Sequence, residues 1–158
     1  MGEDEELSRL QQELKITRAL LEEVRALAMR AAAPIFNQML LYERRRCERY
    51  NHFFCLITVA ADRAAAGDVL RKLGRALRSS DVLGVVNGKN GDSTALEGRR
   101  NGQVIIGVIL PETDRQGGER ALERLTSGFP STEDVTVRMA VYPDDATEVA
   151  ELLAITVP

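Results

Sequence analysis

Apolar residues recur at alternating spacings of three and four along the first thirty residues. The series is Leu7, Leu10, Leu14, Thr17, Leu21, Val24, Ala28 and Ala31. This alternation is typical of the a and d positions of a coiled coil, and charged residues flank it. The pattern predicts an N-terminal helical unit over residues 1–33 that pairs in parallel with a second copy of the chain. The alternative is that this seam packs back onto its own domain and leaves a monomer. Pro34 removes a helical hydrogen bond, so we expect the helix to end there.

Beyond Pro34, helical and extended patterns alternate over a second unit, residues 34–158. A helix over residues 35–50 comes first. Strands are expected near residues 52–60, 81–86, 103–110 and 134–142, with helices near 69–77, 115–125 and 143–154. The alanine-rich stretch ADRAAAGD separates the first strand from its helix. The order β-α-β-β-α-β-α after the entry helix predicts an α+β fold, a ferredoxin-like sheet with helices packed on one face.

Composition and charge narrow the class of protein. The 158 residues are 44% hydrophobic and 28% charged, with a net charge of -3, which favours a soluble protein without general affinity for nucleic acid or anionic lipid. No apolar run approaches the roughly 20 residues that span a bilayer, so we expect no membrane insertion. The acidic start lacks the zones of a signal peptide. Cys47 and Cys55 are expected to be buried thiols in a reducing compartment, which predicts a cytoplasmic protein.

Several stretches of residues 35–154 resemble, in order, the GGDEF domain of diguanylate cyclases, whose core is shared with nucleotide cyclases. The stretches are FNQMLLYERRRCERYNHFFCLITV, DVLRKLGRALRSSDVLGVV, VIIGVILPETD and VTVRMAVYPDDATEVAELL. The LPETD and VYPDDA segments are the most specific. The resemblance implies a role in cyclic di-GMP signalling in bacteria. The family continues beyond the point where this sequence stops, so the chain is either a fragment or an abbreviated form.

The resemblance also implies where catalytic groups should stand, and here the sequence departs from it. The family's signature hairpin contributes acidic residues that help to hold two divalent cations. Counted from LPETD, those places fall at Val104 and Ile105; counted from SSD, they fall at Asn90 and Gly91, with Asp92 further out.

At the end of the first strand the expected acidic places hold Thr58 and Ala60, and Asp62 is displaced towards the next helix. We therefore expect a catalytically inactive domain without metal or cofactor. The long 87–103 link would then stand where an active site was lost, and its order is left open. An active diguanylate cyclase is the remaining alternative.

One functional motif of the family is retained. Its inhibitory site is an Arg-x-x-Asp motif before the second strand, and RSSD supplies Arg78 and Asp81. In that role the arginine binds phosphate or a guanine edge, and the aspartate accepts hydrogen bonds from guanine. The resemblance thus implies a cyclic di-GMP receptor. The other interpretation is a helix end running into a strand, with Asp81 capping a turn.

The remaining polar residues do not indicate a zinc site or a nucleophilic catalytic site. The four arginines Arg44, Arg45, Arg46 and Arg49 either complement a helix dipole or offer a surface to an acidic or phosphate-bearing partner. The single histidine, His52, lacks companions for a zinc site. Ser79 and Ser80 have no evident base. The sequence therefore predicts an inactive signalling module that dimerises through its N-terminal helix and acts as a protein-interaction or regulatory domain, with the cyclic di-GMP receptor as the alternative.

Overall fold

The computed structural model describes residues 2–86, 103–129 and 135–157, apart from the side chains of residues 3, 22, 23 and 25–34. The 87–102 part of the long link therefore lies outside the described residues. In chain order the described elements are α1 (Gly2–Tyr50), β1 (Phe54–Asp62), α2 (Arg63–Ala76), β2 (Val82–Val85), β3 (Gln103–Pro111), α3 (Arg115–Thr126), β4 (Val135–Tyr142) and α4 (Val149–Thr156).

The four strands form one sheet in the order β2-β3-β1-β4, and every neighbouring pair is antiparallel. Each of the connections β1-α2-β2 and β3-α3-β4 passes over one intervening strand. This interleaving of two βαβ units is the ferredoxin-like arrangement, so the predicted fold class is confirmed. Strands β1 and β3 are the two interior strands, and their largely apolar residues are almost all buried there.

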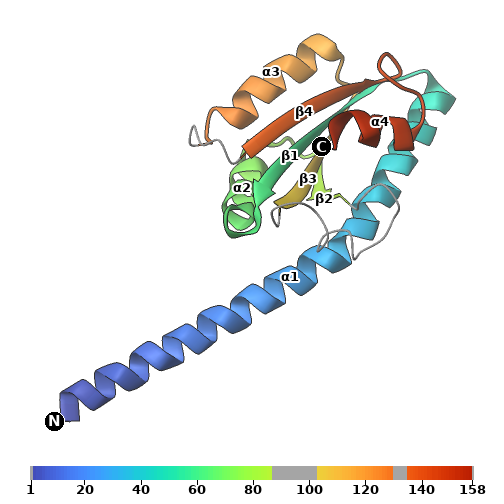
Figure 1. Ribbon diagram of the computed structural model, residues 1–158. Coiled ribbons are helices and arrows are strands. Elements are labelled where there is room, and N and C mark those ends of the chain that lie inside the picture. The colour runs from blue at the N-terminus through green and yellow to red at the C-terminus, as the bar shows by residue number, and fades with distance from the viewer. Residues whose placement is uncertain (1, 87–102, 130–134, 158) are drawn as a thin grey trace.

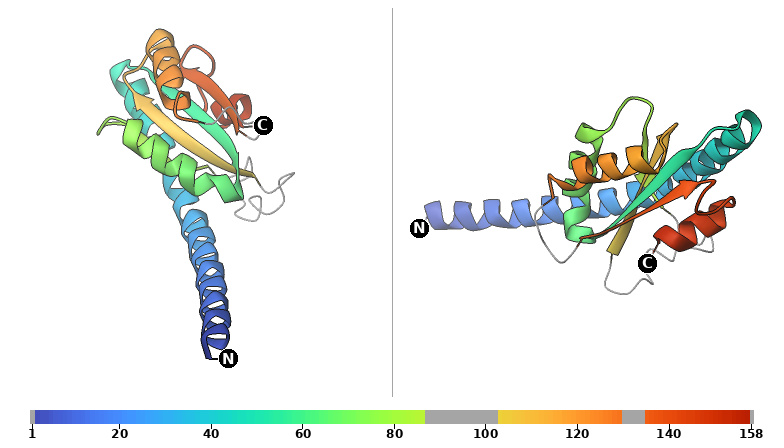
Figure 2. Two further views of the ribbon diagram at one scale, coloured as in Figure 1. Left: turned by 90° about the vertical axis from the view of Figure 1, so that its left-hand side faces the viewer. Right: turned by 90° about the horizontal axis from the view of Figure 1, so that it is seen from above.

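The sheet carries helices on both faces, not on one as the sequence predicted (Figures 1 and 2). Helices α2 and α3 cover the face to which Ile57 and Val59 point. The C-terminal half of α1 and α4 cover the other face, to which Leu56 and Ala60 point. The prediction was wrong because the entry helix was assigned to no face, although β1 is apolar on both sides and needs two covering layers.

Helix α1 docks through one aromatic side chain. Phe36 is 1% exposed, and its ring lies over Gly84 and Gly107, which pair across β2 and β3. A Cβ added at Gly107 would stand 2.4 Å from that ring, and one at Gly84 would stand 2.9 Å from it. These two glycines therefore make the hollow in the sheet that receives the helix.

Three boundaries differ from the prediction. Helix α1 runs through Pro34 without a break (Figure 1), since the alanine-rich sequence before it is strongly helix-forming. Helix α2 begins at Arg63, so the three consecutive alanines of ADRAAAGD, residues 64–66, are helical and not a link. The last helix begins at Val149, because residues 143–145 form a turn in which Asp145 Oδ2 accepts a 2.7 Å bond from the Val141 backbone N–H.

Helix α1 ends at Tyr50 for a local reason. Asn51 has a φ of 54°, and the His52 backbone N–H donates to the Cys47 carbonyl at 3.0 Å. This left-handed residue with its 6→1 bond is the Schellman arrangement, and asparagine adopts it more readily than most residues. The chain then turns directly into β1.

Candidate functional site

Arg78 and Asp81 lie in the tight connection between α2 and β2. Asp81 Oδ2 accepts a hydrogen bond from the Arg78 backbone N–H at 2.8 Å, and the Asp81 N–H donates to the Arg78 carbonyl at 3.1 Å. The carboxylate thus caps its own turn, as the structural interpretation of RSSD expected. This bond leaves the side chain of Arg78 exposed, so the capped turn still presents a guanidinium to solvent.

The exposed side of this turn faces a cavity of about 300 Å³ between the turn, the end of β3 and α3. Three arginines line it: Arg78, Arg120 and Arg124. Arg120 and Arg124 stand four residues apart on α3, so they share one face of that helix. The sequence motif identified only Arg78. The spacing of the other two after LPETD was the available signal, but it indicates a shared face without saying what that face meets.

Acidic and aromatic groups complete the wall. Asp81, Glu112 and Asp114 supply carboxylates, and Phe53, which is 41% exposed, supplies an aromatic ring. A cavity with guanidinium donors, carboxylate acceptors and an open ring face suits a ligand that is both anionic and aromatic.

The β3–α3 turn forms the floor of the cavity and is pinned by several short contacts. Asp114 caps α3 by accepting from the Gly117 N–H at 2.8 Å. The Cys55 thiol donates to the carbonyls of Thr113 and Asp114, both at 3.3 Å. The Thr113 hydroxyl donates to the Pro111 carbonyl at 3.0 Å. Because burial raises the pKa of Cys55 to about 12, this thiol remains a donor at neutral pH.

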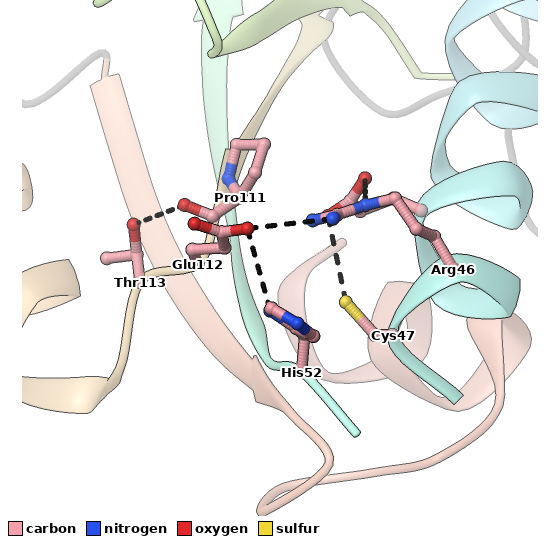
Figure 3. A network of polar contacts seen from close by, with 7 residues as sticks. Arg46, Cys47, His52, Pro111, Glu112 and Thr113 are labelled. Atoms are coloured by element: carbon pink, nitrogen blue, oxygen red, sulfur yellow. Dashed lines mark hydrogen bonds and ion pairs between the residues drawn. The ribbon is translucent and has the colours of Figure 1, made fainter. Parts of the chain in front are cut away.

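A polar network joins the cavity wall to helix α1 (Figure 3). Glu112, which has a φ of 51°, lies 3.6 Å from Arg46 and 3.5 Å from His52 Nδ1. Arg46 also forms a 2.8 Å ion pair with Glu43, a carboxylate that is only 8% exposed. The hydrogen bond to Glu43 raises the pKa of Arg46 above its ordinary range. The entry helix and the cavity therefore share Glu112 as a contact.

Cys47 belongs to the same network. Its thiol donates to Glu43 at 3.6 Å, and burial, reinforced by the nearby carboxylate, raises the pKa of Cys47 to about 11. Cys47 and Cys55 are both free and buried, as the sequence predicted.

Those expected carboxylate positions that the structure describes lie in the packed interior. Thr58 is 2% exposed, and its hydroxyl donates to the Thr156 carbonyl in the last turn of α4 at 2.7 Å. Ala60 packs in the same layer under α1 and α4. Val104 and Ile105 are 4% and 1% exposed and point into opposite layers of the core.

Two further predictions concern residues near this end of β1. Asp62 ends β1 opposite Gln103 and is partly buried. Asn90, Gly91 and Asp92 lie outside the described residues. Within the described ranges, no three acidic, cysteine or histidine side chains converge as a metal site would need.

The four arginines near the end of α1 divide into two pairs. Arg44 bonds Glu48 at 3.0 Å and Glu148 at 2.9 Å, which ties α1 to the start of α4. Arg46 is engaged by Glu43, as described above. Arg45, Arg46 and Arg49 line a hollow of about 590 Å³ beside Tyr42 and Tyr50. Arg44 and Arg46 are thus held by ion pairs within the chain, whereas Arg45 and Arg49 are exposed.

The predicted dimerisation seam is exposed. Along the part of α1 that extends away from the sheet (Figure 1), its large apolar side chains are between 52% and 61% exposed: Leu7, Leu10, Leu14, Leu21 and Val24. This excludes packing of these side chains back onto their own domain. The side chain of Ala28 lies outside the described residues.

Comparisons with known proteins support the fold. No family model matches the chain, and no curated protein matches its sequence. A diguanylate cyclase protein from Thermotoga maritima matches with a TM-score of 0.54 and 14% identity, over 78% of this chain and 89% of that one. The diguanylate cyclase SiaD of Pseudomonas aeruginosa, solved with its activator SiaC, matches with a TM-score of 0.50 and 17% identity, over 87% of this chain and 60% of that one.

A segment of PelD from Pseudomonas aeruginosa PA14 matches with a TM-score of 0.50 and 21% identity, over 68% of this chain and 38% of that one. The chain therefore spans only part of the SiaD and PelD structures. No helix in the described part of the chain combines the length and apolar character needed to cross a bilayer. The chain has the fold of diguanylate cyclase-type domains.

Proposed function

We propose that this chain is a non-catalytic signalling domain that binds cyclic di-GMP in the cavity beside Arg78 and Asp81. The observation that carries the proposal is the convergence of Arg78, Arg120 and Arg124 on one cavity that also contains Asp81. Cyclic di-GMP offers two phosphates to guanidinium groups and guanine N–H donors to a carboxylate. The two free, buried thiols favour a cytoplasmic setting for this function.

The size of the cavity limits how much of the ligand it can enclose. At about 300 Å³ it stands at the lower end of the range for small-molecule sites, about 300–1,000 Å³. It can take one guanylate half of the dinucleotide, with the other half open to solvent. Phe53 is placed to stack on the enclosed base.

The absence of catalysis is proposed from the packed strand positions. Phosphoryl transfer by a two-cation site needs several oxygen ligands at the base of the signature hairpin. Here Thr58 is engaged by α4, and Ala60, Val104 and Ile105 are packed in the core. Incubation with GTP and magnesium should therefore yield no cyclic di-GMP. Measurable product would contradict this part of the proposal.

The binding proposal is tested by calorimetric titration of the full chain with cyclic di-GMP. Arg78→Ala and Arg124→Ala should each weaken binding at least tenfold, since a hydrogen bond to a charged group contributes about 1.5–3 kcal/mol. Asp81→Asn should weaken binding without removing the side chain. Arg71→Ala is the matched control, because Arg71 is an exposed arginine of α2 that pairs with Asp68 away from the cavity. No heat with the parent protein would overturn the proposal.

A second function, dimerisation through the seam Leu7, Leu10, Leu14, Leu21, Val24 and Ala28, is favoured by a separate observation. The described large apolar members of this seam are all exposed, on a helix that extends away from the sheet. Pairing with a second copy would remove them from water and present two domains together to a protein partner. Light scattering should give a dimer mass for the parent chain and a lower mass for Leu14→Glu. A monomeric parent would contradict it.

A further inference from the structure

The continuity of α1 through Pro34 changes how far the heptad register extends. With Leu7 as position a, the same register places Ile35 and Tyr42 at a and Gln38 at d. A helix break at Pro34 would have ended this register at Ala31. In one unbroken helix the register reaches the half of α1 that packs on the sheet.

At position a, the side chains of this second half of α1 are as exposed to solvent as those of the first half. Ile35 is 62% exposed and Tyr42 is 69% exposed, as open as Leu7 at 59% and Leu14 at 53%. Two large apolar or aromatic side chains thus stay in solvent on a helix whose other side is fully buried.

The sheet is docked on the opposite side of α1. Phe36, Leu40 and Cys47 are each 1% exposed or less, and they occupy positions b and f of the same heptads. At 100° per residue, these positions lie about 120° to 160° around the helix axis from Tyr42. The domain therefore contacts the outer face of the helix and leaves the a and d face open at the described positions of both halves of α1.

We infer that a second copy of this chain packs in parallel along both halves of α1, with Ile35 and Tyr42 each meeting the same residue of the partner. This inference rests on the proposed dimer and extends it onto the surface of the domain. The contact ends after Tyr42, because the next d and a positions are Arg45 and Arg49 and would bring like charges together.

The orientation follows from charge. From Glu6 to Tyr42, the charged residues at g are Glu6 and Glu13, and the charged residues at e are Arg18 and Arg25; the other g and e positions hold uncharged residues. A parallel pair places g of one helix near e of the other, and Glu13 and Arg18 have the spacing of five residues that this pairing requires. An antiparallel pair would place g beside g and e beside e, so it would lose the pairing of Glu13 with Arg18.

A consequence concerns the relative placement of the two domains. The helix that carries the seam is also the helix that Phe36 and Leu40 anchor to the sheet, so pairing of the seam would also set where the two domains lie relative to each other.

Single cysteines at seam positions test the inference in the full chain. Leu14→Cys, Ile35→Cys and Tyr42→Cys should each give a disulfide-linked dimer on mild oxidation. Ile16→Cys is the matched control, because Ile16 is apolar and 55% exposed but lies at position c. The native thiols should stay silent, since both are buried.

The outcomes are distinguishable. If Leu14→Cys crosslinks but Ile35→Cys and Tyr42→Cys do not, the extension is overturned and the dimer stands. If Tyr42→Cys crosslinks with Leu10→Cys but not with itself, the parallel orientation is overturned. If no variant crosslinks and the parent mass is that of a monomer, the proposed dimer and its extension along α1 are both overturned. The proposal that the chain binds cyclic di-GMP is tested separately by calorimetry and does not depend on this result.

A charge substitution gives a second measurement. Tyr42→Glu should raise the dissociation constant of the dimer at least tenfold, measured by light scattering across a dilution series, while Ile16→Glu should change it less than twofold. Equal effects of the two variants would overturn the inference.

Discussion

The cavity beside Arg78 and the strand positions around Thr58 are two regions of one sheet with opposite characters. The cavity is lined by exposed charged side chains, and its turn is held by hydrogen bonds that leave Arg78 open. The region around Thr58 is buried, and its hydroxyl is occupied by α4. The difference indicates that the first region can exchange water for a ligand, whereas the second would have to unpack before any ligand entered.

The largest expected effect compares two phenylalanines, one from each region. Phe36→Ala should lower the free energy of unfolding by about 3–5 kcal/mol, because it empties the hollow above Gly84 and Gly107. Phe53→Ala should cost less than about 1 kcal/mol, because Phe53 is partly exposed, but it should weaken binding of cyclic di-GMP. Urea denaturation and calorimetric titration check both. Equal losses of stability in Phe36→Ala and Phe53→Ala would contradict the distinction between a packed and an open region.

A carboxylate placed in the packed region should be costly. Thr58→Asp should lower the free energy of unfolding by about 3 kcal/mol, because it buries a charge against the Thr156 carbonyl. Thr58→Val should cost only about 1 kcal/mol, the value of one hydrogen bond.

Adding magnesium tests whether the region around Thr58 can still hold a cation. If the packed region has no room for a cation, magnesium chloride should leave the melting temperature of Thr58→Asp unchanged. A rise of several degrees with magnesium, absent from Thr58→Val, would show that the region still admits a metal.

The buried thiols predict how stability depends on pH. Burial raises the pKa of Cys47 from 9.0 to about 11 and that of Cys55 from 9.0 to about 12. The unfolded chain therefore loses these protons first as pH rises. The stability associated with them is complete below about pH 9 and is lost towards pH 11–12, by up to about 1.4 kcal/mol per thiol for each pH unit.

Urea denaturation at pH 7, 9 and 10 measures this slope. The double variant Cys47→Ala, Cys55→Ala lacks both thiols, so its stability should fall less steeply above pH 9. An identical slope would contradict the assignment to these two groups.

The smallest effect concerns the floor of the cavity. Asp114→Ala should lower the free energy of unfolding by about 1 kcal/mol, because it removes the N-cap of α3. Glu119→Ala, at an exposed position of the same helix, should stay within about 0.5 kcal/mol of the parent. Thermal denaturation of the two variants side by side tests the difference. A loss for Glu119→Ala as large as that for Asp114→Ala would show that the cap has no special role.

By itself the sequence determined what depends on neighbouring residues. The strand and helix periods, the Asp81 turn and the a and d register of α1 are all local patterns, and the strand and helix periods predicted the ferredoxin-like fold. The choice of Arg78 and Asp81 as a candidate site came from the resemblance to the GGDEF family. The one strong local signal that failed was Pro34, because proline opposes a helix without forbidding it and the residues on both sides favour one.

Only the tertiary structure decided which distant groups meet. It brought Arg120 and Arg124 of α3 to the turn that holds Arg78, and it placed α1 and α4 on the second face of the sheet. It also brought α4 against Thr58, one of the positions where a catalytic carboxylate was expected. This contact joins Thr58 to Thr156, which lies 98 positions further along the chain, so no local pattern could predict it. Such choices follow from the burial of apolar surface shared by all elements, which no single segment of the chain specifies.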